Sequence, residues 1–347
     1  MPSDVTPLLE RLRARIGAQN PPDVARDPVN PAMIRHWCDA MTDANPVYTD
    51  PDRAAKSIHG GIVAPPAMLN AWTMPGLPGR RRNDQSMNPM RALDAAGFTS
   101  VIATNSEHEY VRYLRPDDLL LGYSELVDVS EEKQTALGLG HFVTSRTTYR
   151  TQDGQQAGRM FLRLLKFRPG TGRSASSGTG RSASSGTGRS VSSGGAAGSQ
   201  AAPARDLRPP RRETTLRAAE IGPGDVLAPC AVPITTTLIV AGAIASRDYQ
   251  DVHHDRDAAI RRGTPDIFMN ILTSSGIVAR YVTDWAGPEA LLTALRIRLG
   301  APNYPGDTML LAGRVANAEG GRVEVAIRGS NRLGDHVTGT VELRLPA

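Results

Sequence analysis

The chain has 347 residues and a formal net charge of +5. This length favours two domains of ordinary size, each able to bury its own core, over one compact domain. The two cysteines, Cys38 and Cys230, are far apart and have no Cys-x-x-Cys or Cys/His spacing near them, so neither a disulfide framework nor a metal site is indicated. The basic residues are nearly all Arg and no nucleic-acid-binding motif accompanies them, so we expect no nucleic-acid partner.

The N-terminal segment MPSDVTPLLERLRARIG lacks the basic, apolar and small-residue order of a secretory signal. No apolar run approaches the length that spans a bilayer. The sequence thus predicts a cytoplasmic protein that is neither secreted nor embedded in a membrane. The mild excess of positive charge would suit an anionic small molecule, although it could equally have no meaning.

Residues 1–168 form the first predicted module. A short helical stretch precedes Asp43, and alternating apolar and polar residues predict strands at 101–109, 119–128, 134–151 and 155–167. Residues 75–96 are rich in Pro, Arg, Asn and Met, which is typical of an inserted loop. Arg80, Arg81 and Arg82 in this loop could meet the phosphates of a ligand or be a solvated run.

Residues 169–205 consist almost entirely of Gly, Ser, Ala, Thr and Arg. The unit GTGRSASS begins at Gly170 and again at Gly178, and GTGRSVSS begins at Gly186. A segment without apolar side chains cannot offset the entropy of ordering, so it predicts a disordered tether with a reach on the order of 30 Å. The tether separates the first module from a second one at 206–347.

The second module again begins with a helical stretch, which ends at Asp248. The segment DIFMNILTSSGIVARYVTDW that starts at Asp266 has apolar residues at helical spacing and predicts a second, central helix. Strands are then expected at 290–299, 308–316, 322–331 and 336–345. A helix followed by antiparallel strands predicts an α+β module whose sheet wraps the helix.

The two modules resemble each other in sequence, which indicates an internal repeat. Residues 34–55 align without a gap on 239–260, so that Asp43 lies over Asp248 and Tyr48 lies over His253. Farther on, YLRPDDLL aligns with NYPGDTMLL. The extra residues of the first module are best placed in the inserted loop.

Asp248 and His253 are the candidate catalytic pair. They stand five residues apart at the end of a helical stretch, a spacing that lets one turn direct both side chains toward a shared water as general base and acid. By itself, an aspartate followed five residues later by a histidine arises by chance in many chains. The alternative is structural, with Asp248 capping a helix and His253 solvated.

The segment SRDYQDVHHDRDAA resembles the hydratase motif of the MaoC-like and (R)-specific enoyl-CoA hydratases, and DANPVYTDPDRAA in the first module resembles the same motif. The resemblance covers about 300 residues. It implies two tandem hot-dog modules that form a double hot-dog, each a central helix wrapped by an antiparallel sheet. The run DIFMNILTSSGIVARYVTDWAG is similar to a subgroup that acts on bulky steroid side-chain CoA esters, and the chain resembles a fusion of the two chains of that subgroup.

The resemblance also implies roles for individual residues. Asp248 and His253 match the catalytic pair, whereas Tyr48 replaces the histidine in the first module, which should therefore lack acid and base chemistry. That module could bind the acyl chain or CoA, or serve as a scaffold. Asn270 stands where the family has a glycine whose N–H faces the thioester oxygen, so its backbone N–H could serve as the oxyanion donor or the residue could only cap the helix.

The sequence therefore predicts reversible addition of water to a trans-2-enoyl-CoA thioester that carries a bulky acyl chain, with no cofactor or metal, by a chain that could form a homodimer of double hot-dogs. A hot-dog thioesterase, an acyl-carrier dehydratase and a non-catalytic acyl-CoA-binding protein are the alternatives. The remaining histidines considered are expected to be surface or packing residues, namely His59, His108, His141 and His336.

Overall fold

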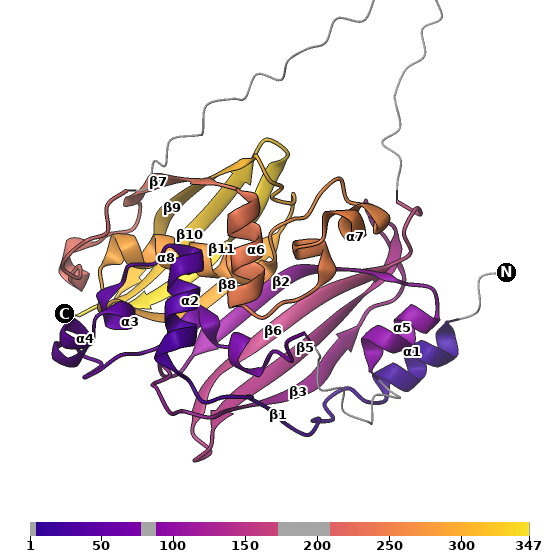
Figure 1. Cartoon of the computed structure of the whole chain (residues 1–347), viewed down its shortest axis with the longest axis horizontal. Coiled ribbons are helices and arrows are strands. Elements are labelled where there is room, and N and C mark those ends of the chain that lie inside the picture. The colour runs from indigo at the N-terminus through magenta and orange to yellow at the C-terminus, as the bar shows by residue number, and fades with distance from the viewer. Residues whose placement is uncertain (1–4, 78–87, 173–208, 347) are drawn as a thin grey trace, which may run out of the picture.

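The computed structural model describes residues 5–77, 88–172 and 209–346, and in this part of the chain both halves contribute to one antiparallel sheet of 11 strands (Figure 1). From one edge to the other the strands are β1 (Asp23–Val24), β3 (Leu120–Val129), β5 (Leu139–Thr151), β6 (Gln156–Phe167), β2 (Ser100–Tyr110), β8 (Leu291–Leu299), β11 (Gly334–Arg344), β10 (Arg322–Asn331), β9 (Thr308–Glu319) and β7 (Val226–Pro233). The short β4 (Lys133–Gln134) pairs with β5.

The halves meet in the middle of this sheet, where β2 pairs with β8 and Ser106 lies opposite Ile297. Helices and 3-10 turns cover the sheet. The first half has α1 (Thr6–Arg13), α2 (Pro31–Met41), α3 (Pro46–Thr49), α4 (Pro51–Lys56), η1 (Pro66–Met68), η2 (Ala71–Thr73) and α5 (Pro89–Ala95). The second half has η3 (Ala218–Glu220), α6 (Thr236–Ala245), η4 (Asp251–His253), α7 (Arg256–Arg261) and α8 (Ile271–Ala286).

The predicted strands are present, with small shifts at their ends. The predicted strand at 134–151 is two elements, β4 and β5, and the one at 308–316 extends to Glu319. Strand β7 was not predicted. Its sequence VLAPCAVP contains two prolines and no alternation, and proline is accommodated there because β7 lies at the edge of the sheet.

The central helix of the second half is α8, which is buried along nearly its whole length. It begins at Asn270, whose side-chain oxygen accepts a hydrogen bond from the backbone N–H of Thr273 at 2.8 Å, and it ends at Gly287 with φ 104°. The first half has only the turns η1 and η2 at the corresponding place. Met74 is extended ahead of Pro75, which stops any continuation of a helix.

The inserted loop therefore follows an interrupted helix, as expected, but it is not a loop throughout. Residues 89–95 form α5, capped by Asn88. The arginine run at 80–82 lies outside the described residues, and so does most of the predicted tether at 169–205.

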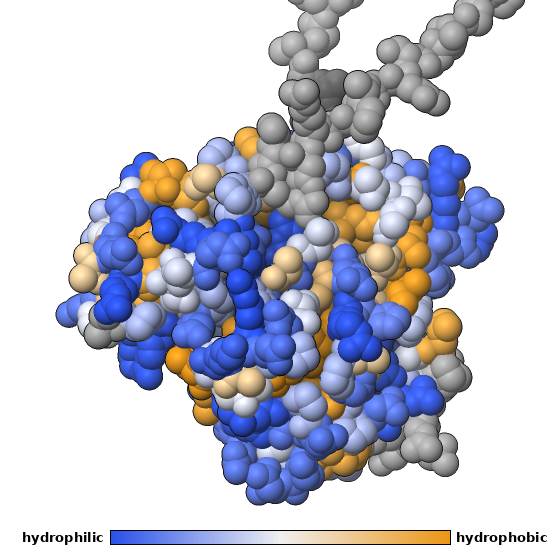
Figure 2. All heavy atoms as spheres, turned by 60° about the vertical axis from the view of Figure 1, so that its left-hand side comes forward, coloured by the Kyte–Doolittle hydropathy of each residue, from blue (hydrophilic) through white to orange (hydrophobic). Residues whose placement is uncertain are grey.

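One large apolar core joins the halves, with residues of α2, α6 and α8 packed together over the sheet. Gly276 of α8 allows this packing, since a Cβ atom there would lie 2.8 Å from the sulfur of Met41 and 2.9 Å from the ring of Trp37. Figure 2 shows that hydrophilic residues dominate one outer face, with apolar patches between them. None of the helices in the described residues is long and apolar enough to cross a membrane.

Candidate active site

Asp248 and His253 are positioned by the chain that leaves α6. Arg247 takes a left-handed conformation, with φ 58°, and the backbone N–H of Asp248 then closes on the carbonyl of Ala243 at 3.0 Å. The same turn precedes Asp43, where Thr42 has φ 53°. The two aligned aspartates thus occupy equivalent positions at the ends of α6 and α2.

The candidate side chains come together in the second half and are buried. The Nε2 atom of His253 lies 3.5 Å from Oδ2 of Asp248, and the side-chain amide of Asn270 donates to that same Oδ2 at 3.1 Å and to Oγ of Ser246 at 2.9 Å. Asp248 caps no helix, and His253 is 5% exposed. Both structural alternatives, a helix cap and a solvated histidine, are therefore inconsistent with the structure.

The tautomer of His253 follows from its second nitrogen. Nδ1 lies 2.7 Å from the carbonyl oxygen of Phe268, which can only accept, so Nδ1 carries the proton. Burial lowers the pKa of His253, although the carboxylate of Asp248 acts in the opposite direction. A neutral imidazole with a free lone pair on Nε2, directed at Asp248, is the result.

This pair borders a cavity of about 170 Å³ between the two halves. The second half contributes most of the polar lining, including Gln250, Asn270 and His336. The first half contributes an apolar wall with one polar residue, made of Asn70, Met74, Val101, Ile102, Ala103, Leu162 and Leu164.

Free backbone donors stand at the start of α8. Within the described residues, the N–H groups of Asn270, Ile271 and Leu272 have no protein acceptor, and all three residues line the cavity. The positive end of the helix dipole is at the same place. This is a suitable environment for an oxygen that gains negative charge.

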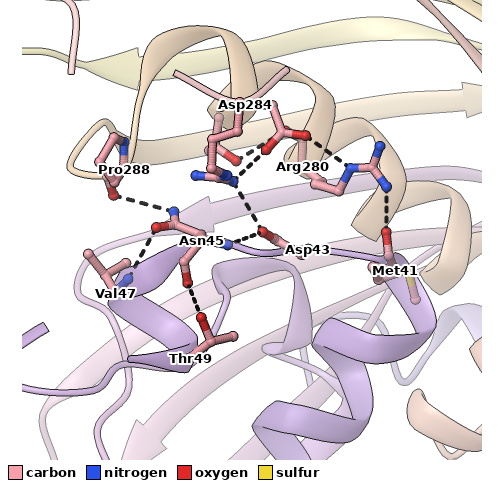
Figure 3. Close-up of polar contacts among 10 residues, drawn as sticks. Met41, Asp43, Asn45, Val47, Thr49, Arg280, Asp284 and Pro288 are labelled. Carbon is pink, nitrogen blue, oxygen red and sulfur yellow. Dashed lines mark hydrogen bonds and ion pairs between the residues drawn. The ribbon is translucent and has the colours of Figure 1, made fainter. Parts of the chain in front are cut away.

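The corresponding site of the first half is closed by ion pairs (Figure 3). Arg211 contacts Asp43 at 3.1 Å and Asp284 of α8 at 2.6 Å, and Asp284 also pairs with Arg280 at 3.1 Å. The backbone N–H of Asn45 donates to Asp43 as well. Burial raises the pKa of Asp43, and Arg211 opposes this. The carboxylate is thus occupied by protein groups.

Tyr48, at the position of His253, is buried and hydrogen-bonded to Tyr113. Burial raises its pKa well above the ordinary value for tyrosine, so it stays protonated near neutral pH. The backbone N–H of Leu292 donates to the hydroxyl of Tyr113 at 2.7 Å, so these tyrosines connect the first half to β8.

Comparison with known proteins places the chain in a family. Residues 14–159 match the family described as FAS1-like, dehydratase domain region. The beta subunit of 3-oxo-4,17-pregnadiene-20-carboxyl-CoA hydratase from Mycobacterium tuberculosis is 55% identical over 109 residues, which cover 31% of this chain and 84% of that subunit. The chain belongs to the MaoC-like hydratase family. The predicted resemblance is confirmed.

Other relatives match different fractions of this chain. The alpha subunit of the same hydratase is 45% identical over 159 residues, 45% of this chain, and this chain spans 51% of the length of that subunit. A solved MaoC-like dehydratase, with 19% identity, superposes with a TM-score of 0.70 over 96% of this chain and 99% of its own. A Mycobacterium tuberculosis protein described as having a double hotdog fold superposes with a TM-score of 0.57, at 14% identity, over 93% of this chain and 95% of its own. The predicted double hot-dog fold is confirmed.

The MaoC-like sequence pattern did not reveal every residue that the fold brings to these sites. Arg211 lies just after the low-complexity segment, and Asn70 lies in an interrupted helix, so neither carried a local signal. The histidines expected at the surface or in packing are all buried, and His336 lines the cavity with its Nε2 2.9 Å from Oγ of Ser274. Burial of all four agrees with the packing half of that expectation and not with the surface half; the four are His59, His108, His141 and His336.

Proposed function

We propose that this chain is an enoyl-CoA hydratase that adds water reversibly across the C2–C3 double bond of a trans-2-enoyl-CoA. The observation that carries the proposal is a pair of hydrogen-bond acceptors, Nε2 of His253 and Oδ2 of Asp248, which lie 3.5 Å apart at one cavity. Two acceptors at this separation suit a water molecule that donates one hydrogen to each. The reaction forms a C–O bond at C3 and a C–H bond at C2, with proton transfers that these two side chains can mediate, and it needs no cofactor.

In the proposed mechanism the water oxygen attacks C3 as His253 Nε2 accepts one of the water protons. The fixed tautomer favours this assignment, because the Nε2 lone pair is free. Asp248 accepts a hydrogen bond from the second O–H of the water, which stays intact as the C3 hydroxyl of the product, and its charge stabilises the imidazolium that forms. The proton held by His253 is then delivered to C2, so that the elements of one water are added to the substrate.

Electrons move from the double bond toward the thioester oxygen during the attack. The free N–H of Asn270 at the start of α8 would donate to that oxygen and lower the energy of the enolate. The side chain of Asn270 has a separate role, since it holds Asp248 and Ser246 in place. The residue therefore contributes through two different groups.

A bulky acyl chain is the proposed substrate class. The cavity at Asp248 and His253, about 170 Å³, is smaller than the range of about 300–1,000 Å³ that is usual for ligand sites. A second cavity of about 400 Å³ lies over β3 and β5, and Leu164 borders both. Together they could take an acyl group with fused rings, and two of the relatives are named for a pregnadiene-carboxyl-CoA substrate.

The two halves of the chain would have different roles in the reaction. Residues 206–347 would carry the chemistry, and residues 1–168 would supply the acyl-binding wall, with 169–205 as the tether between them. The fused chain could further assemble as a homodimer, as the named alpha and beta subunits of the relatives suggest for association between chains of this family.

The test is turnover of enoyl-CoA substrates followed by absorbance of the conjugated thioester, with free thiol measured in parallel. We expect the absorbance to fall without thiol release, and a substrate with fused rings to be preferred over crotonyl-CoA. Thiol release would instead indicate a thioesterase. Tight binding of the CoA ester without either change would indicate a binding protein.

A further inference from the structure

His336 of β11 and Ser274 of α8 form a buried hydrogen-bonded pair next to the candidate active site. Nε2 of His336 lies 2.9 Å from Oγ of Ser274, and the two residues are 2% and 0% exposed. Nδ1 of His336 lies 2.8 Å from the carbonyl oxygen of Ala301, which can only accept, so Nδ1 carries the proton and Nε2 is an acceptor. Burial lowers the pKa of His336, so the ring stays neutral near neutral pH. The hydroxyl of Ser274 therefore donates to His336.

Ser274 does not need this partner in order to be hydrogen-bonded. Its Oγ also lies 3.1 Å from the carbonyl oxygen of Asn270, one turn earlier, and serine hydroxyls inside helices commonly donate to such a carbonyl. The neighbouring Ser275 does so, to the carbonyl of Ile271 at 2.8 Å. Donation to His336 instead ties the first turn of α8 to strand β11.

The first half has apolar residues at the two matching positions. Equivalent backbone hydrogen bonds identify these positions: the bond from Val63 to Val47 corresponds to that from Phe268 to Val252, and the bond from Val111 to Ala157 corresponds to that from Gly300 to His336. Counting from these bonds, Leu69 lies over Ser274 and Ala157 lies over His336. Leu69 and Ala157 are both buried. The serine–histidine pair therefore belongs to the half that also contains Asp248 and His253.

The first turn of α8 carries two groups of the proposed mechanism. The backbone N–H of Asn270 is the proposed oxyanion donor, and the side-chain amide of Asn270 donates to Asp248 at 3.1 Å. The carbonyl oxygen of Asn270 accepts from the backbone N–H of Ser274 at 3.2 Å, so a shift of Ser274 would also move Asn270. His336 itself borders the cavity at Asp248 and His253. The bond to β11 thereby helps to set where these groups lie relative to the cavity.

We propose that His336 is a positioning residue for the hydration reaction: by accepting from Ser274, it holds the first turn of α8 where the backbone N–H can meet the thioester oxygen of the substrate. The inference rests on the proposed function and adds a residue that acts through Ser274. Stabilisation of a transition state requires its donors to be placed to within about 0.5 Å. Loss of this bond should therefore slow the chemical step more than it weakens substrate binding.

His336→Asn and His336→Gln separate the bond to Ser274 from the other contacts of the histidine. The amide nitrogen of the shorter Asn can replace Nδ1 and keep the bond to Ala301, but Asn does not reach Ser274. The longer Gln can present its oxygen near the position of Nε2. With the preferred enoyl-CoA we expect His336→Asn to lower kcat roughly tenfold with KM changed by less than about twofold, and His336→Gln to recover most of kcat.

An optical probe measures the polarisation of the thioester carbonyl directly. Dimethylaminocinnamoyl-CoA is an enoyl thioester whose absorption band moves to longer wavelength when its carbonyl oxygen accepts hydrogen bonds. We expect the unaltered protein to cause this shift, and His336→Asn to bind the probe with similar affinity but to cause a smaller shift. If His336→Asn does not fold, Ser274→Ala removes the same bond from the donor side and should give the same result.

Tyr281→Phe is the matched control, because the hydroxyl of Tyr281 anchors a later turn of α8 by donating to the carbonyl of Ala228 at 3.0 Å. It should lower the melting temperature about as much as His336→Asn does and leave kcat and the band shift unchanged. The proposal is overturned if His336→Asn lowers only the melting temperature, if Tyr281→Phe lowers kcat equally, or if folded His336→Gln is as slow as His336→Asn. Failure of the proposed function would appear differently, as absence of both turnover and band shift in the unaltered protein, and it would overturn this inference too.

Discussion

Replacing Asp248 by Asn and His253 by Ala tests the proposed chemistry most directly. Asp248→Asn keeps the shape of a side chain held by Asn270 but removes the charge, and His253→Ala removes the Nε2 acceptor. General acid and base catalysis typically contributes about a hundred- to ten-thousand-fold per group, so kcat should fall by that factor in each variant. Because both groups act on one water, the double variant should be little worse than either single one.

The first half provides matched controls at the aligned positions. Asp43→Asn and Tyr48→Phe should leave kcat within a few-fold of the unchanged protein, because Asp43 is occupied by Arg211 and Tyr48 by Tyr113. Kinetics with the preferred enoyl-CoA, followed by absorbance, measure all of these variants, and chemical denaturation checks that each is folded. Turnover that persists in His253→Ala but disappears in Tyr48→Phe would refute the reasoning and locate the working site in the first half.

Three further predictions concern stability and assembly. Arg211→Met leaves Asp43 as a buried carboxylate without an ion-pair partner, while the half-buried Asp284 keeps Arg280, and it should lower the free energy of unfolding by about 3–5 kcal/mol with kcat nearly unchanged. Adding Asp43→Asn should recover part of the loss, and additive effects would contradict the ion-pair network. Burial lowers the pKa of His108 to about 4, so the unfolded chain binds a proton at this histidine more readily than the folded chain does. The free energy of unfolding should therefore fall by roughly 3 kcal/mol as the pH drops from about 6.5 toward 4. The denaturation midpoint of His108→Gln should depend less on pH over this range. Proteolytic cleavage within 169–205 should leave the two halves associated, as measured by gel filtration, and should leave turnover intact, because β2 pairs with β8. Separation of the halves at micromolar concentration with loss of activity would contradict that pairing.

Much of the fold could be predicted because its signals are local. The apolar period of α8 and the alternation in β9, β10 and β11 are properties of adjacent residues. Strand β7 escaped prediction because its prolines disfavour a strand, and only its place at the edge of the sheet makes them acceptable. The joining of the halves through β2 and β8 depends on contacts nearly 200 residues apart, which no local pattern encodes.

The candidate site likewise contains residues that a local motif predicted and residues that it did not. Asp248, His253 and Asn270 were predicted from a motif, and the structure brings them together, while their catalytic roles stay predictions. The partners of Asp43 could not be predicted, because Arg211 reaches it across 168 positions of sequence. Asn70 could not be predicted as a cavity-lining residue either, because the wall to which it belongs is assembled only in the folded chain.

The interrupted helix of the first half accounts for several of these differences at once. A helix as long as α8 after η1 would fill the space beside β6 and β2 with side chains, as α8 does over its own strands. Pro75 prevents it, and the cavity walls at Leu162 and Leu164 are left open to a ligand. In the proposed function the first half binds the acyl chain and does not catalyse, so its aspartate has no catalytic role. Asp43 can then serve stability alone, paired with an arginine that also secures the C-terminal end of the helix carrying Asn270 at its start.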